Sequence, residues 1–170
     1  VKISAIANGA KVNLTWIDSK DFEKDPKQIS SLKNFDGVIV PGGFGQTGIE
    51  GIIQTIKFTR ENKIPYFGLC YGMQLMVIEY ARNVLGLKDA NTAEINPKAK
   101  DVVIDIMPDQ KQKLKEGNYG GSMRLGAYKA KLKKGTIAES AYGASEIVER
   151  HRHRYEVNPE YIKQIESGKI

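Results

Sequence analysis

Residues 64–77 read Ile-Pro-Tyr-Phe-Gly-Leu-Cys-Tyr-Gly-Met-Gln-Leu-Met-Val, and this stretch decides the fold. The mostly apolar run at 64–69 is typical of a strand that is buried on both faces. After Cys70, apolar residues recur at helical spacing on one face, and Gly86 is placed to end that helix. The residues of this face are Met73, Met76, Val77, Tyr80 and Val84. A Gly-x-Cys-x-Gly sequence therefore joins a predicted strand to a predicted helix.

The residues on either side extend this alternation of strands and helices. The apolar run at 35–40 predicts a strand that ends at Pro-Gly-Gly, and the isoleucines at 49–56 recur at helical spacing. A further strand is predicted at 11–17. Strand, helix, strand and helix in this order predict an α/β fold with a mainly parallel open sheet flanked by helices. Runs at 102–107 and 123–132 predict additional antiparallel strands in the second half.

The composition limits the possible functions. A length of 170 residues supports one domain, and we find no linker that would divide it. No apolar run is long enough to cross a bilayer and no secretory signal is present, so we expect a cytoplasmic protein without a membrane partner. One cysteine and two histidines predict no metal site. The net charge of +6 is spread along the chain, which favours a solvated surface over nucleic-acid binding.

Cys70 is the candidate nucleophile. Gly68 and Gly72 permit the tight turn from strand to helix that holds a nucleophile above a sheet, and the helix N-terminus favours a thiolate. A lone cysteine is more often a small buried residue, but the two flanking glycines favour the nucleophile. Attack on an amide creates an oxyanion, for which we predict the backbone N–H groups of Tyr71 and Gly43 as donors. Gly43 could also belong to an ordinary glycine turn.

Several motifs then resemble the CTP synthase family, in particular its class I glutamine amidotransferase domain. They occur in the same order as in that family and extend from about residue 11 to the end. They are Pro-Gly-Gly-Phe-Gly at 41–45, Gly-Leu-Cys-Tyr-Gly-Met-Gln at 68–74, Ala-Arg-Asn-Val-Leu-Gly at 81–86, Gly-Gly-Ser-Met-Arg-Leu-Gly at 120–126 and Glu-Arg-His-Arg-His-Arg-Tyr-Glu-Val-Asn at 149–158. The first two are shared by many class I amidotransferases, whereas the last two are typical of CTP synthases.

The resemblance implies a glutaminase that releases ammonia from L-glutamine through a thioester on Cys70, without a cofactor in this domain. It also implies a set of glutamine-binding residues. They are Gly43, Tyr71, Gly72, Met73, Gln74, Glu94 and Arg154. A carboxylate at Glu94 suits the ammonium group of glutamine, and the guanidinium of Arg154 suits its carboxylate. Without the resemblance, Glu94 would be interpreted as a surface carboxylate.

The same resemblance implies a larger enzyme. Ammonia would pass to a synthetase domain, not contained in this chain, that uses ATP and Mg²⁺ to convert UTP to CTP. The whole enzyme would be a homotetramer activated by GTP. The arginines and histidines at 150–154 alternate, so in a strand they would occupy opposite faces. For the residues other than Arg154, a charged surface strand and a functional contact remain equal alternatives.

Some family features differ or are missing. The catalytic histidine and carboxylate of the family belong to a His-Pro-Glu segment, which these 170 residues do not contain, and the first strand of the sheet is also missing. We expect residues 1–170 to be an incomplete amidotransferase domain. The alternatives are a catalytically silent glutamine-binding domain and a free-standing cysteine hydrolase. Tyr71 and Thr47 stand where the family usually has leucine and arginine, and the second change makes GTP dependence less secure.

Overall fold

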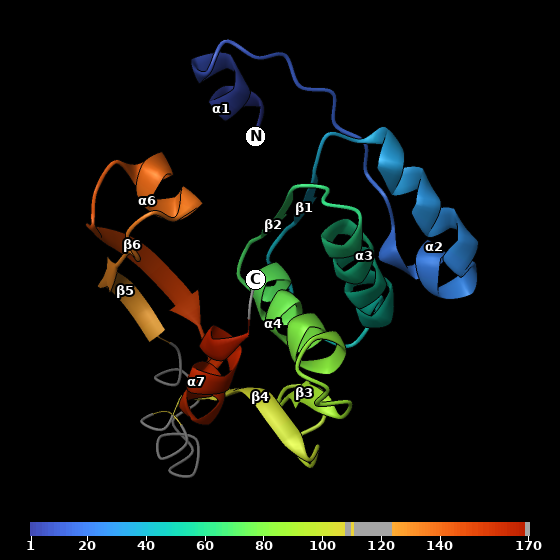
Figure 1. Cartoon of the computed structure of the whole chain (residues 1–170), viewed down its shortest axis with the longest axis vertical. Coiled ribbons are helices and arrows are strands. Elements are labelled where there is room, and N and C mark those ends of the chain that lie inside the picture. Colours follow the sequence, from blue (N-terminus) through green and yellow to red (C-terminus); the bar gives the residue numbers. More distant parts are fainter. Residues whose placement is uncertain (108–109, 111–123, 169–170) are drawn as a thin grey trace.

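A strand, a helix, a second strand and a second helix follow one another through the centre of the domain (Figure 1). The computed structural model describes residues 1–107, 110 and 124–168. The four elements are β1 (Val38–Val40), α3 (Ile49–Glu61), β2 (Tyr66–Gly68) and α4 (Tyr71–Asn83). β1 and β2 are paired in parallel, with Val40 opposite Gly68. The order predicted from the sequence is confirmed, and the carboxyl ends of both strands meet at one edge.

The second half of the chain adds one parallel and two antiparallel pairs among the described strands. β3 (Ala90–Thr92) and β4 (Asp101–Ile106) are parallel, and β7 (Tyr155–Val157) lies antiparallel to β4. β5 (Arg124–Lys131) and β6 (Glu146–His153) form a separate antiparallel ribbon. The α/β class with parallel and antiparallel strands is confirmed, although the described strands form three short sheets rather than one. Residues 108–109 and 111–123 lie outside the described part of the chain, and with them the first residue of the strand predicted at 123–132 and part of the motif at 120–126.

Helix α4 lies at the centre of the hydrophobic core. It packs against α3 on one side and against β2, β3 and β4 on others. Leu75, Ile78 and Ala81 are fully buried, whereas Met76 and Val84 are each 40% exposed. The prediction of a single buried apolar face is therefore partly wrong. A helix that is covered from several sides buries residues on more than one face.

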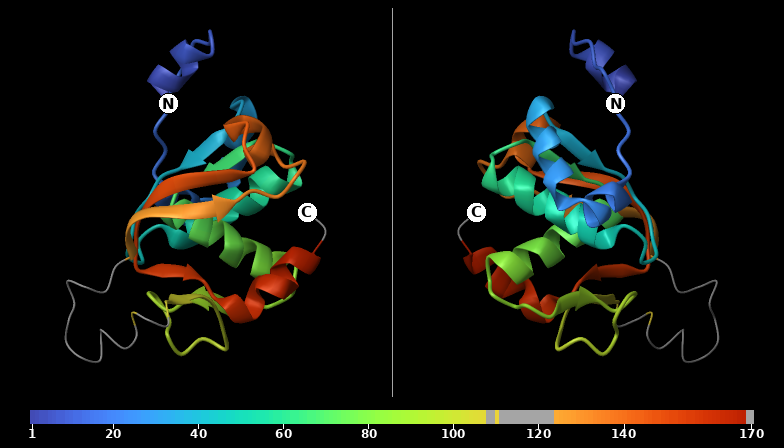
Figure 2. Two further views of the ribbon diagram at one scale, coloured as in Figure 1. Left: turned by 90° about the vertical axis from the view of Figure 1, so that its left-hand side faces the viewer. Right: turned by 90° about the vertical axis from the view of Figure 1, so that its right-hand side faces the viewer.

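The N-terminal region differs most from expectation. Residues 11–17 form no strand, and the side chain of Trp16 is 89% exposed. No neighbouring strand among the described residues offers these residues a hydrogen-bonding partner, and without one an alternating pattern cannot become a strand. Before this segment, α1 (Lys2–Ala7) has no buried residue and lies apart from the rest of the chain (Figure 2).

The remaining helices are short. α2 (Ser19–Lys24) is capped by Asp18, whose carboxylate accepts a hydrogen bond of 3.0 Å from the Lys20 N–H. The 3₁₀ helix η1 (Pro26–Asn34) follows directly. α6 (Ile137–Tyr142) joins β5 to β6, and α7 (Pro159–Ser167) follows β7. Among the described helices, none is both long enough and apolar enough to cross a membrane.

Candidate active site

Cys70 lies at the sharp turn between β2 and α4, with its side chain exposed. Its backbone has φ 51° and ψ −102°, a conformation that non-glycine residues rarely adopt. Such strain is held in place only when the surrounding structure enforces it, and it is concentrated at functional sites. The predicted turn from strand to helix, which we call the elbow, is therefore present, with Cys70 at the position that carries the strain.

The two glycines around Cys70 are required by close packing. A Cβ at Gly68 would lie 2.6 Å from backbone atoms of Gly72 and Met73, closer than real Cβ atoms come to backbone. A Cβ at Gly72 would collide with the backbone of Val40 in the neighbouring strand. Tyr66 also donates a hydrogen bond of 2.9 Å to the Gly72 carbonyl. The glycines thus allow α4 to start directly against both strands.

The glycine loop that follows β1 lies beside the elbow. A Cβ at Gly42 would lie 3.4 Å from the Cβ of Cys70, and one at Gly43 would lie 3.5 Å from the Tyr71 ring. Within the described part of the chain, neither the Gly43 N–H nor the Tyr71 N–H has a hydrogen-bond partner. Two free backbone donors are therefore available close to the thiol.

Glu94 is tied to the glycine loop and is not a free surface carboxylate. The Gly45 N–H donates a hydrogen bond of 3.0 Å to Glu94 Oε1, and the Tyr71 hydroxyl donates one of 2.5 Å to the Gly45 carbonyl. Burial raises the pKa of Tyr71 to about 12, and the nearby charge of Glu94 adds to this shift. The hydroxyl therefore remains a donor at neutral pH, and the loop is held from both sides.

Arg154 occupies the bend between β6 and β7, and its Nε is buried without a hydrogen-bond partner among the described residues. The next residue, Tyr155, accepts at its carbonyl a hydrogen bond of 3.0 Å from Nε2 of Gln74. Burial raises the pKa of Tyr155, Glu94 raises it further and Arg154 lowers it. Tyr155 thus lies within electrostatic range of both charged residues that the sequence singled out.

Not every predicted binding residue offers a side chain to this region. Met73 packs against the hydrophobic core, and Gly72 is buried against Val40. Gln74 is 5% exposed, with its amide directed to the Tyr155 carbonyl. No local sequence pattern predicted this contact or the link from Gly45 to Glu94. For the hydrogen bond from the Tyr71 hydroxyl to Gly45, the only local indication was that tyrosine stands where the resembling family usually has leucine.

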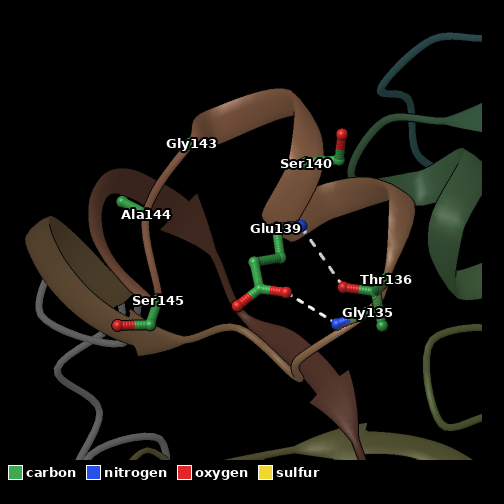
Figure 3. A pocket seen from close by; sticks show the side chains of 7 residues that line it. All are labelled: Gly135, Thr136, Glu139, Ser140, Gly143, Ala144 and Ser145. Atoms are coloured by element: carbon green, nitrogen blue, oxygen red, sulfur yellow. Dashed lines mark hydrogen bonds between the residues drawn. The ribbon is translucent and has the colours of Figure 1, made fainter.

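A hollow of about 450 Å³ lies elsewhere, around α6 (Figure 3). Its polar groups serve the start of that helix: Gly135 N–H donates to Glu139 Oε2 at 2.6 Å, and Glu139 N–H donates to Thr136 Oγ1 at 3.3 Å. This is a helix cap, and it holds none of the candidate residues. Within the described residues, no three His, Cys, Asp or Glu side chains lie together as metal ligands would.

The fold and the elbow define a class of proteins in which a cysteine nucleophile stands at a strand-to-helix turn beside a glycine loop. Residues 3–168 match the family model described as glutamine amidotransferase class-I. The chain belongs to the class I glutamine amidotransferase family.

Within that family, the chain is similar to CTP synthases. It is 53% identical over 166 residues to the CTP synthase of Methanococcoides burtonii, covering 98% of this chain and 30% of that protein. The CTP synthase of Clostridium acetobutylicum is 54% identical over 165 residues, with coverage of 96% and 30%. The chain therefore spans about 30% of the length of these curated relatives.

A solved structure has the same fold. It is the glutaminase domain of Trypanosoma brucei CTPS with bound acivicin, with a TM-score of 0.86 and 38% sequence identity. The match covers 95% of this chain and 61% of that chain.

Proposed function

We propose that this chain is the glutaminase part of a CTP synthase and that Cys70 is its nucleophile. The observation that carries the proposal is the strained Cys70 backbone at the start of α4, with the glycine loop alongside. The similarity to curated CTP synthases along nearly the whole chain supports the choice of enzyme.

The first half of the reaction follows from the elbow. The Cys70 thiolate attacks the side-chain carbonyl carbon of glutamine, and the oxyanion accepts hydrogen bonds from the N–H groups of Gly43 and Tyr71. The C–N bond then breaks, the nitrogen takes up a proton, and ammonia leaves behind a thioester. Water attacks the thioester, releases glutamate and restores the thiol.

Glu94 and Arg154 are suited to hold the other end of the substrate. Oε1 of Glu94 is engaged by Gly45, whereas its second oxygen has no partner within the described residues and can accept from an ammonium group. The buried Nε of Arg154 lacks a partner among those residues, and it can donate to the glutamine carboxylate. Unpaired buried donors are costly, so a ligand that satisfies this one is favoured.

The reaction also needs a proton carrier, and His153 is poorly placed for this role. Its Nδ1 contacts the Tyr155 carbonyl at 3.0 Å and its Nε2 contacts Nδ1 of His151 at 2.8 Å. Both ring nitrogens are thus engaged. We propose that the proton carrier is a histidine in a His-Pro-Glu segment like that of the CTP synthase family.

For the whole enzyme, we propose that the ammonia aminates UTP at a synthetase domain that uses ATP and Mg²⁺. GTP is the proposed activator, the proposed assembly is a homotetramer, and the proposed location is the cytoplasm. Glutamine is the substrate of the part described above, and that part needs no cofactor. Transfer of ammonia to UTP distinguishes this enzyme from a free-standing cysteine hydrolase of the same fold.

The occupied ring nitrogens of His153 also favour a second candidate, a domain that binds glutamine without hydrolysing it. Release of glutamate by the protein as its gene encodes it separates the two. We expect turnover that is abolished by Cys70→Ala, with Cys70→Ser as the sterically matched variant. Equal glutamate release by wild type and Cys70→Ala would refute the proposed mechanism, and glutamine binding without release would favour the second candidate.

A further inference from the structure

The two histidines of β6 share the half-buried face of the β5–β6 ribbon, whereas Arg150 and Arg152 point to the exposed face. The alternation predicted from the sequence is confirmed within β6, whereas Arg154 lies beyond the end of the strand, at a bend, and is half-buried. Neither histidine has a role in the proposed chemistry. Their position beside Arg154 and Tyr155, however, places them next to the part of the site that would hold the substrate carboxylate.

A continuous series of contacts runs along this face. Gly126 on β5 lies opposite His151, and Tyr128 meets the His151 ring edge-on with the ring centres 5.3 Å apart. Nδ1 of His151 lies 2.8 Å from Nε2 of His153. Nδ1 of His153 lies 3.0 Å from the Tyr155 carbonyl oxygen. The imidazoles are thus held between the ribbon and the start of β7.

The carbonyl at the end of this series determines the direction of both histidine hydrogen bonds. A carbonyl oxygen only accepts, so Nδ1 of His153 must carry a proton and donate to Tyr155. In a neutral His153 ring, Nε2 is then an acceptor, and the proton between the rings belongs to Nδ1 of His151. The arrangement requires one defined tautomer at His153.

The same carbonyl also receives a hydrogen bond from helix α4. Nε2 of Gln74 donates to it at 3.0 Å, and the Gln74 backbone N–H donates at 3.0 Å to the carbonyl of Cys70. Tyr155 is therefore fixed by two donors, one from β6 and one from the first turn after the nucleophile. Arg154 lies between His153 and Tyr155, so its backbone is held on both sides.

We propose that His153 is a positioning residue that, together with Gln74, fixes the Tyr155 carbonyl and thereby aims Arg154 at the glutamine carboxylate. This inference rests on the proposed glutaminase function. His153 touches no reacting atom, and it acts through the main chain of Arg154 and Tyr155. Its loss should weaken glutamine binding much more than it slows the chemical step.

Two substitutions of His153 test whether the hydrogen bond to the Tyr155 carbonyl matters, because both remove the imidazole ring but only one keeps the donor. In His153→Asn the side-chain NH₂ replaces Nδ1 and can still donate to Tyr155. In His153→Gln the amide replaces Nε2 and reaches His151 instead. Since one hydrogen bond contributes a modest net free energy, we expect His153→Gln to raise the glutamine KM about three- to tenfold. We expect kcat to change less than twofold, and His153→Asn to stay within about twofold of wild type in both constants.

The experiment uses the protein as encoded by its gene and measures glutamine protection of Cys70 against 6-diazo-5-oxo-norleucine, together with turnover. Arg152→Gln, on the exposed face, is the matched control. Equal protection constants for His153→Gln and wild type, or equal losses in both His153 variants, would overturn the inference. If glutamine fails to protect even the wild type, the proposed function itself is wrong and the inference fails with it. Nitrogen NMR of the His153 ring gives a test without variants: a proton on Nε2 in place of Nδ1 would also overturn it.

Discussion

Gly45 and Glu94 are joined by a hydrogen bond of 3.0 Å between the backbone N–H of the first and Oε1 of the second, across 49 positions of the chain. This bond connects the glycine loop after β1 to the turn after β3. It places a carboxylate beside the elbow, with one oxygen holding the loop and the other available for the proposed contact with the substrate ammonium group.

Glu94→Gln should separate these two roles. The amide oxygen can still accept from Gly45, but the negative charge that attracts an ammonium group is gone. Because a hydrogen bond to a charged group contributes about 1.5–3 kcal/mol, we expect glutamine affinity to fall at least tenfold. Reaction of Cys70 with iodoacetamide should not change. Glu160→Gln on α7 is the control, and an unchanged glutamine affinity in Glu94→Gln would argue against ammonium recognition.

Gly72→Ala should destabilise the fold, because the new methyl group would collide with the Val40 backbone. Overpacking of this kind costs about 1–3 kcal/mol, and the Val40 backbone, fixed in its strand, has little room to relax. Gly43→Ala is the matched control, since its methyl group would only reach ordinary contact with the Tyr71 ring. Urea unfolding measures both variants, and equal midpoints would contradict the packing described for the elbow.

Tyr71 should make stability sensitive to alkaline pH. Burial, and then the charge of Glu94, raise its pKa from 10.0 to about 12 in the folded state. The folded protein therefore retains this proton while the unfolded chain loses it, so stability is unaffected below pH 10 and decreases as pH rises toward about 12. Tyr71→Phe should reduce this loss, and it should lower stability at neutral pH by about 1 kcal/mol through the missing bond to Gly45. Identical alkaline unfolding curves for the two proteins would refute the assignment.

Glu79 should be important for folding rather than chemistry. Its side chain is 1% exposed. Arg60 donates to it from Nε at 3.1 Å and from Nη2 at 2.7 Å. Arg60→Ala would leave the buried carboxylate without its ion-pair partner and with the Asn83 Nδ2 hydrogen bond of 3.2 Å in its place, at a cost of about 3 kcal/mol. Lys24→Ala removes an exposed pair with Asp21 and should change stability by less than about 0.5 kcal/mol. Thermal unfolding of both variants tests this, and an Arg60→Ala protein as stable as Lys24→Ala would contradict it.

Local chemistry explains why the elbow could be predicted. The glycines at 68 and 72, the cysteine between them and the apolar runs on both sides are contained in a few residues, so the turn from strand to helix follows from sequence alone. The opposite faces of the histidines and arginines in β6 follow from the twofold period of a strand in the same way.

Other features depend on partners that are distant in the sequence. Residues 11–17 alternate like a strand, but the described residues offer them no strand to pair with, so they remain irregular. The exposure of Met76 and Val84 follows from the way several elements surround α4. Gly45 finds Glu94 only after the chain has folded, and no local pattern predicts that contact. The roles of the site residues remain predictions.

The central claim is that Cys70 is an activated nucleophile within an assembled glutamine site. The most direct test is intact-mass analysis with peptide mapping after exposure to 6-diazo-5-oxo-norleucine, with and without glutamine. We expect one label per chain, located on Cys70 and blocked by glutamine. Absence of labelling in the protein as its gene encodes it, or labelling that glutamine does not block, would contradict the claim.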